Sequence, residues 1–140
     1  MKTVWTNGCF DLLHAGHVTF LEQAATFGSV VVFINSDESV RALKGSTRPI
    51  VPLQHRVKIL SALRCVSRVV PFDGPNPVRK WEESGRFPDL YVKDTSCDVL
   101  NSEEGQWLTK RGIIITLLPR LPDISTTDIV RSIRERSSVS

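Results

Sequence analysis

The sequence predicts an α/β protein with a doubly wound, five-stranded parallel sheet. Short strand-like runs alternate with helix-like segments along the chain, which is typical of parallel strands joined by helical crossovers. Residues 30–34 (VVVFI) are apolar at every position, as expected of a strand covered on both faces. No repeat or linker divides the 140 residues. We therefore expect a single domain over residues 1–140, with the right-handed crossovers that such sheets require.

In the N-terminal half, local signals predict two strands and two helices. Residues 2–6 (KTVWT) form a short strand candidate, and 30–34 is the second strand. Between them, apolar residues recur at helical spacing over 16–27, and Gly28 has the position of a C-terminal cap. Residues 53–64 (LQHRVKILSALR) carry the next apolar stripe at helical spacing, so a helix is predicted there.

The C-terminal half continues the alternation. Asn76 and Pro77 are a favourable cap and first-turn pair for one helix. Ser125 and Asp128, in the run STTD, have the spacing of a capping box for the last helix. The predicted strands are 68–72, which Pro71 interrupts, 89–93 and 113–118. The predicted helices are 76–84, 101–111 and one that begins at Ser125.

Composition excludes several classes of protein. With 41% apolar residues the chain can build a core, yet no apolar run approaches the ~20 residues of a membrane helix. The N-terminal MKTVWTNG has no apolar segment of the kind found in signal peptides. Cys9, Cys65 and Cys97 are far apart in the chain, so we expect free thiols in a reducing cytoplasm. We expect no membrane association.

The charge pattern favours a small anionic ligand. The net charge is only +3, and apart from the C-terminal RSIRERS the basic residues are scattered. A nucleic-acid-binding surface normally shows a denser basic patch. We therefore expect no nucleic acid partner.

The strongest functional signal is the segment TNGCFDLLHAGH, residues 6–17. It follows the first predicted strand, and ligands of doubly wound sheets bind beyond the carboxyl ends of the strands. His14 and His17 lie three residues apart, with Gly16 between them. The pattern therefore places two imidazoles and a flexible backbone position in the expected ligand crevice.

Four interpretations of the two histidines are open. Both can be structural, with backbone partners. They can share a metal ion, although a structural zinc needs four ligands and only Cys9 is near. Cys9 can pair with a histidine as a nucleophile, although no orienting group is evident. They can also bind phosphate, because a helix that begins near Gly16 offers unpaired N–H groups and a positive dipole end. Only phosphate binding accounts for all parts of the segment together.

The chain resembles the cytidylyltransferase-like nucleotidyltransferase family, which carries an HxGH motif after a segment like NGCFD. The resemblance extends over nearly the whole chain, and within the family it is strongest to heptose 1-phosphate adenylyltransferase domains and next to glycerol 3-phosphate cytidylyltransferases. It implies a Rossmann-like fold shared with class I aminoacyl-tRNA synthetases. The matching residues outside the HxGH motif are Asn35-Ser36-Asp37, Leu43-Lys44-Gly45, Arg48-Pro49, Pro52-Leu53, Arg56, and Arg120 followed by Ile-Ser-Thr-Thr at 124–127.

The resemblance also implies roles for individual residues. His14, His17, Lys44 and Arg120 would be catalytic, with the histidines at the phosphates and Lys44 in a glycine-rich loop. Asp11 would orient a histidine or help to hold Mg²⁺, and no complete set of metal ligands is assigned. The acceptor would contact Lys44, Asn35 and Arg48, while Arg56 belongs either to the site or to a helix surface. The nucleotide would contact Thr6, Asn7, Gly8, Cys9, Phe10, Asp11, Gly16, Lys93, Ser125, Thr126 and Thr127, the first five of which would form a loop around it.

The implied reaction is transfer of a nucleoside monophosphate, from ATP in preference, to a phosphorylated sugar, with release of pyrophosphate. Mg²⁺ and a homodimer are implied with it. Alternatives are a cytidylyltransferase that uses CTP and a polyol phosphate such as glycerol 3-phosphate, a nucleotide-binding protein without catalysis, and a nucleic-acid-binding protein. Residues 94–98 (DTSCD) replace a glycine-rich stretch of the adenylyltransferase relatives, which helps to hold the base and ribose. Asp94 or Asp98 can substitute for part of it.

Overall fold

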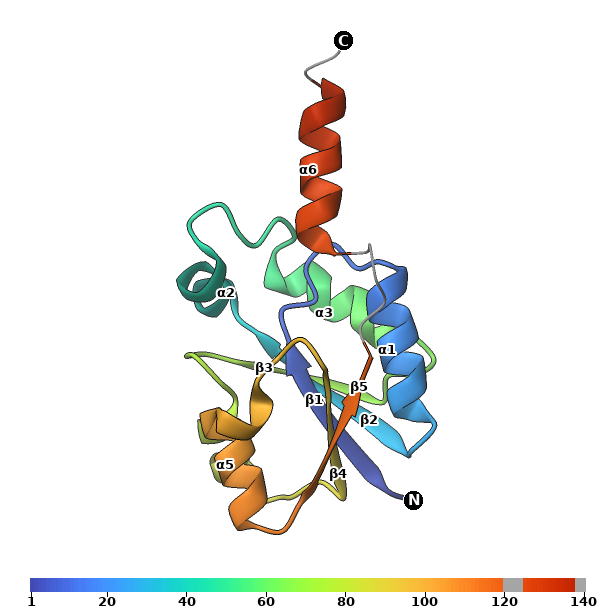
Figure 1. Cartoon of the computed structure of the whole chain (residues 1–140), viewed down its shortest axis with the longest axis vertical. Coiled ribbons are helices and arrows are strands. Elements are labelled where there is room, and N and C mark those ends of the chain that lie inside the picture. Colours follow the sequence, from blue (N-terminus) through green and yellow to red (C-terminus); the bar gives the residue numbers. More distant parts are fainter. Residues whose placement is uncertain (120–124, 138–140) are drawn as a thin grey trace.

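The computed structural model describes residues 1–119 and 125–137. In this part of the chain, five parallel strands form one sheet in the order β3-β2-β1-β4-β5, shown in Figure 1. The chain therefore winds outward from β1 in both directions, and the predicted doubly wound α/β fold is confirmed. The strands are β1 (Thr3–Gly8), β2 (Ser29–Asn35), β3 (Arg68–Phe72), β4 (Leu90–Asp94) and β5 (Ile114–Leu118).

Two apolar clusters cover the two faces of the sheet. On one face, α1 (Ala15–Ala25) and α3 (Leu53–Ser61) pack against alternate residues of the strands, such as Val4. On the other face, α4 (Val78–Ser84) and α5 (Glu103–Lys110) enclose an aromatic cluster around Trp81. Because successive side chains of a strand point to opposite faces, each central strand contributes to both clusters.

The pairing of β1 with its two neighbours is unequal. β1 pairs with β2 from Thr3 to Gly8, but it pairs with β4 only at Val4↔Leu90 and Trp5↔Tyr91. Beyond that point, side chains connect the two strands. Tyr91 Oη donates a hydrogen bond to Asn7 Oδ1, and Lys93 Nζ donates one to the Asn7 carbonyl. The space between β1 and β4 at their carboxyl ends is the switch point of the sheet, where ligands bind in this architecture.

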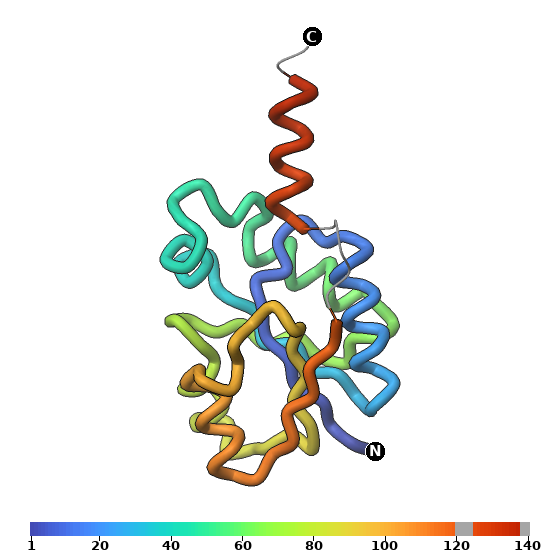
Figure 2. Tube along the Cα trace, viewed as in Figure 1, coloured from blue at the N-terminus to red at the C-terminus, as the bar shows by residue number. Residues whose placement is uncertain are grey.

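The helix α2 (Asp37–Lys44) was not among the predicted helices, although Ser36 Oγ caps it by accepting from Ser39 N at 3.2 Å. The last helix, α6 (Thr126–Ser137), projects away from the rest of the molecule and buries none of its residues (Figures 1 and 2). Ser125 Oγ accepts from Asp128 N at 3.1 Å, so the predicted N-terminal cap is confirmed.

The remaining differences concern the ends of elements. The helices predicted at 16–27 and 53–64 end at Ala25 and Ser61, and the one predicted at 101–111 is a short 3₁₀ turn (Val99–Asn101) followed by α5. Pro71 lies within β3 and is tolerated because β3 is an edge strand. Among the described residues, the helices are too short or too polar to cross a membrane.

Candidate active site

A cleft of about 590 Å³ lies beyond the carboxyl ends of the central strands. Its walls come from the β1–α1 loop, the start of α1, the end of α2, the β4–α5 segment and the start of α6. The volume lies within the range of ligand pockets. The fold therefore brings together at this cleft positions that are more than a hundred residues apart in the sequence.

Most of the residues predicted from sequence line this cleft. Thr6 is the exception: its side chain is completely buried on the α1 and α3 side of β1, because it points opposite to Asn7. The predicted nucleotide contact of Thr6 is therefore wrong, and residues 6–8 are strand, not loop. Arg120 lies outside the described residues. The predicted residues that line the cleft are Asn7, Gly8, Cys9, Phe10, Asp11, His14, Gly16, His17, Asn35, Lys44, Arg48, Lys93, Ser125, Thr126 and Thr127.

His14 and His17 form the N-terminal cap of α1. His14 Nδ1 accepts a hydrogen bond from Gly16 N at 3.0 Å, and His17 Nδ1 accepts one from His14 N at 3.1 Å. The two rings stack with centroids 3.8 Å apart. Because a neutral imidazole that accepts at Nδ1 carries its proton on Nε2, both rings are donors at Nε2. The structural and the phosphate-binding interpretations therefore apply to different nitrogens of the same rings.

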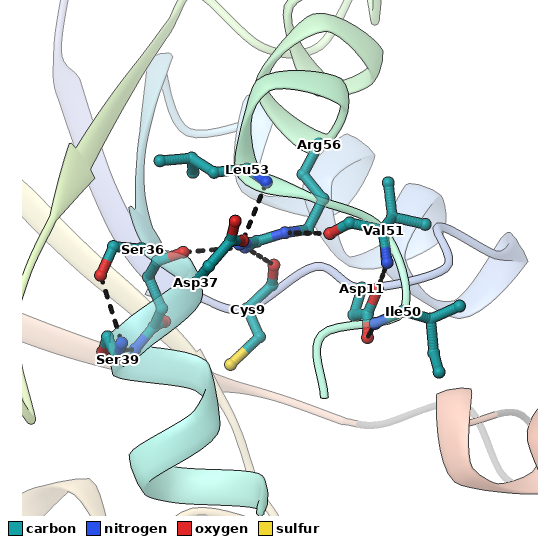
Figure 3. Close-up of polar contacts among 10 residues, drawn as sticks. Cys9, Asp11, Ser36, Asp37, Ser39, Ile50, Val51, Leu53 and Arg56 are labelled. Carbon is teal, nitrogen blue, oxygen red and sulfur yellow. Dashed lines mark hydrogen bonds and ion pairs between the residues drawn. The ribbon is translucent and has the colours of Figure 1, made fainter. Parts of the chain in front are cut away.

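Asp11 fastens the β1–α1 loop to a distant segment. Its carboxylate accepts hydrogen bonds from Ile50 N at 2.7 Å and from Val51 N at 2.9 Å, as Figure 3 shows. Its carbonyl accepts from Thr126 Oγ1. Both carboxylate oxygens therefore hold the backbone of residues 50 and 51. The predicted task of Asp11, to orient a histidine or help to hold Mg²⁺, stays a prediction.

Arg56 is buried beneath the cleft, with 1% of its surface exposed (Figure 3). Its guanidinium donates to four oxygens: Val51 O at 2.8 Å, Cys9 O at 2.9 Å, Asn35 O at 2.8 Å and Asp37 Oδ1 at 2.8 Å. Asp37 Oδ1 also accepts from Leu53 N at 2.9 Å. The helix-surface interpretation of Arg56 is therefore wrong. It is a positioning residue that joins the carboxyl ends of β1 and β2 to the segment before α3.

Lys44 enters the cleft from a helix. It is the last residue of α2, exposed to solvent, and not part of a glycine-rich loop as predicted. Asn35 Nδ2 donates to Ser39 Oγ at 2.9 Å, which fixes α2 to the end of β2. Arg48, half-buried, lines the same side of the cleft. The acceptor residues predicted from sequence therefore lie in one region.

The cysteine and metal interpretations of the histidines have no support in this geometry. Burial raises the pKa of the Cys9 thiol, and this effect exceeds the lowering by Lys44, Arg56 and Lys93. The thiol therefore stays protonated at neutral pH, and the protonated form is a poor nucleophile. Over residues 1–119 and 125–137, no three His, Cys, Asp or Glu side chains converge in a way that could hold a metal ion.

Comparison with known proteins identifies relatives of most of the chain. Residues 5–132 match the family model described as cytidylyltransferase-like. The chain is 45% identical over 137 residues to the bifunctional protein HldE of Hydrogenovibrio crunogenus, and 43% identical over 136 residues to that of Aeromonas hydrophila. These alignments cover 96% of this chain but only 28% of each relative.

A solved structure shares the fold. The lipopolysaccharide core biosynthesis protein from Thermoplasma volcanium superposes with a TM-score of 0.68 at 24% sequence identity. The match covers 86% of this chain and 97% of that one.

Proposed function

Because the chain belongs to the cytidylyltransferase-like family, we propose that it is a nucleotidyltransferase that moves a nucleoside monophosphate from an NTP to a phosphorylated sugar. The observation that carries this proposal is the pair of Nε2 donors at the start of α1. They lie at a helix N-terminus, where backbone N–H groups also favour an anion, in a cleft that Lys44, Arg48 and Lys93 also line.

The proposed substrates are ATP and heptose 1-phosphate. This choice is supported by the similarity to HldE proteins over 96% of the chain. Since those relatives are bifunctional and the chain covers 28% of each, the proposal concerns only the transfer step. CTP with glycerol 3-phosphate is the alternative pair that the test includes.

In the proposed reaction, the acceptor phosphate attacks the α-phosphorus of the NTP. One P–O bond forms, the bond between the α-phosphorus and the bridging oxygen breaks, and its electron pair leaves with pyrophosphate. The acceptor is already an anion at neutral pH, so no general base is needed. His14 and His17 stabilise the charge on the transferring and leaving groups through Nε2–H. Lys44 holds the acceptor phosphate, and positioning of the two anions provides the rest of the rate enhancement.

The start of α6 completes the proposed triphosphate site. Ser125, Thr126 and Thr127 line the cleft at the N-terminus of this helix. Since Ser125 Oγ caps the helix and Thr126 Oγ1 donates to Asp11 O, we assign the phosphate contacts to backbone N–H groups and to Thr127.

We propose that Mg²⁺ enters the site with the triphosphate. The described residues offer no cluster of three ligands, which fits an ion held mainly by substrate phosphates and water. When bound, Mg²⁺ would neutralise part of the charge on the phosphates.

We also propose a homodimer that works in the cytoplasm. The 12 residues of α6 bury none of their side chains, and Ile133 is 60% exposed. A helix of this length is marginally stable alone, so a second copy packed on α6 would stabilise a helix whose first turn lines the cleft. Three free thiols are typical of a reducing compartment.

The test of the proposed function is a pyrophosphate-release assay that crosses ATP, CTP, GTP and UTP with heptose 1-phosphate, ribose phosphate and glycerol 3-phosphate in the presence of Mg²⁺. We expect turnover with ATP and heptose 1-phosphate. Turnover with CTP and glycerol 3-phosphate would replace the proposed substrates. Nucleotide binding without release in any combination would indicate a binding protein and overturn the proposal.

A further inference from the structure

The two walls of the cleft differ in charge. His14, His17, Lys44 and Arg48 supply donors from the α1 and α2 side, where the Asp11 carboxylate is occupied by backbone N–H groups. Three carboxylates line the β4–α5 side, namely Asp94, Asp98 and Glu104, and the Lys93 ammonium of β4 donates to the Asn7 carbonyl. An NTP is itself polarised, with its negative charge on the phosphates and hydrogen-bond donors on its ribose and its base. Repulsion between the phosphates and these carboxylates therefore favours an orientation with the triphosphate toward α1 and the nucleoside toward the carboxylates.

Glu104 differs from the other two carboxylates of that wall. Asp94 accepts hydrogen bonds from Ser96, and Asp98 accepts them from Asn101 Nδ2 at 2.9 and 3.1 Å. The carboxylates of Asp94 and Asp98 thus already accept hydrogen bonds from nearby residues of the same segment. Glu104 lies in the first turn of α5, is half-buried, and accepts no hydrogen bond from the residues that the structure describes. Its acceptor capacity remains for a ligand.

Tyr91 interacts with residues of both sides of this wall. Its hydroxyl holds the side-chain amide of Asn7 on the neighbouring strand β1, and its pKa responds to the charge of Glu104. The Tyr91 hydroxyl donates to Asn7 Oδ1, so the amide of Asn7 is held with its oxygen toward Tyr91 and its NH₂ group is left to donate elsewhere. Burial raises the pKa of Tyr91 well above its ordinary value, and the charge of Glu104 raises it further. Glu104 is thus within Coulomb range of the phenol that orients Asn7, and Glu104 and Asn7 both line the cleft.

We propose that Asn7 and Glu104 select the nucleobase, with Glu104 accepting from an exocyclic amino group and Asn7 Nδ2 donating to the adjacent ring nitrogen. Adenine and cytosine carry an amino group beside an acceptor nitrogen, and guanine carries its 2-amino group beside N3. Uracil carries no amino group and presents carbonyl oxygens, which a carboxylate repels, in its place. The inference rests on the proposed function, because it assumes that the ligand is an NTP.

The test is isothermal titration calorimetry of the full chain with ATP, CTP, GTP and UTP in Mg²⁺, for the wild type, Glu104→Gln and Glu103→Gln. Glu103 is the matched control, because it also lies in the first turn of α5 but its carboxylate accepts from Asn76 Nδ2 and does not line the cleft. We expect the wild type to bind at least one of the three nucleotides with an amino base, ATP, CTP or GTP, more tightly than UTP. Glu104→Gln should reduce that ratio about tenfold or more, and Glu103→Gln should keep it.

Other outcomes overturn the inference. Equal affinities of the wild type for all four nucleotides would exclude selection. A uniform loss of affinity in Glu104→Gln, with an unchanged ratio, would make Glu104 a support for α5 and Tyr91. An unchanged ratio and unchanged affinities in Glu104→Gln would exclude any role of Glu104 in nucleotide binding.

The pyrophosphate assay, run on the same samples, separates the two proposals. Selective binding that depends on Glu104, without release, would overturn the proposed transfer and keep the base selection. Pyrophosphate release together with an affinity ratio that stays the same in Glu104→Gln would keep the proposed transfer and overturn the base selection. The absence of nucleotide binding would overturn both.

Discussion

His14 and His17 stack at a centroid distance of 3.8 Å, and each directs its Nδ1 to a backbone N–H at the start of α1. Helix capping therefore uses one nitrogen of each ring, and the other nitrogen carries the proton that the proposed chemistry needs. A substitution that keeps the helix cap and removes the Nε2–H donor can separate these two functions.

His14→Asn is that substitution. Asparagine is among the best N-terminal caps and keeps an acceptor near the position of Nδ1, but it has no counterpart of Nε2–H. We expect the free energy of unfolding to change by less than about 1 kcal/mol, while the rate of pyrophosphate release falls about 10²–10³-fold. Urea unfolding and the release assay measure the two effects.

His55→Asn is the matched control, because His55 is exposed on α3 and does not line the cleft. Both its stability and its rate should stay close to those of the wild type. Full activity in His14→Asn would limit His14 to capping.

Arg56→Met removes the donor to three backbone carbonyls and to Asp37 beneath the cleft. Since the guanidinium is 1% exposed, we expect the free energy of unfolding in urea to fall by about 3 kcal/mol or more. Arg79→Met is the control, because its ion pair with Glu83 is exposed on both sides and should contribute at most about 0.5 kcal/mol. Equal losses in the two variants would contradict the positioning role.

Lys44→Ala should raise the KM for the phosphorylated acceptor more than the KM for the nucleotide. Lys44 reaches the cleft from the end of α2, beside Arg48, and the proposed triphosphate site lies at the starts of α1 and α6. Steady-state kinetics with each substrate varied in turn measures both constants. Lys58→Ala, an exposed lysine of α3 outside the cleft, should change neither. The opposite ranking of the two constants would assign Lys44 to the triphosphate.

Folding stability should decline at alkaline pH. Burial raises the pKa of Tyr91 well above its ordinary value and also raises the pKa of the Cys9 and Cys65 thiols. The unfolded chain therefore loses these protons first. Stability is complete below about pH 8 and is lost as the pH rises toward the pKa values of the folded state.

Urea unfolding at about pH 7.5 and about pH 10.5 measures this decline. Tyr91→Phe should start lower, because Asn7 loses its hydrogen bond, but should fall less between the two values. An equal or steeper fall in Tyr91→Phe would show that the phenol does not contribute.

Ile133→Asp should dissociate the proposed homodimer. Ile133 is 60% exposed on α6, so a charge there opposes packing against a second copy while leaving the core of the monomer intact. Sedimentation velocity measures the mass in solution. Ile114→Asp, at a 65% exposed position of the edge strand β5, is the control and should keep the dimer. Dissociation by Ile114→Asp alone would move the interface to β5.

The sequence alone predicted the alternation of strands and helices, the doubly wound sheet, and most of the residues that line the cleft. These depend on short-range signals. The apolar run of β2, the cap at Ser125 and the HxGH segment each lie within a few consecutive residues. The helix α2 carries such signals too, since Ser36 precedes acidic residues and Gly45 follows basic ones, but its eight residues lack the longer apolar stripe that predicted the other helices.

The tertiary structure alone decided which polar residues support the site and which face it. Asp11 binds backbone N–H groups 39 and 40 residues away, and Arg56 reaches back 47 residues to Cys9. Thr6 and Asn7 are neighbours, yet one is sealed in the core and the other lines the cleft. The physical reason is that a buried charge or hydroxyl takes its role from the partners that the fold brings to it, and those partners are far away in the sequence.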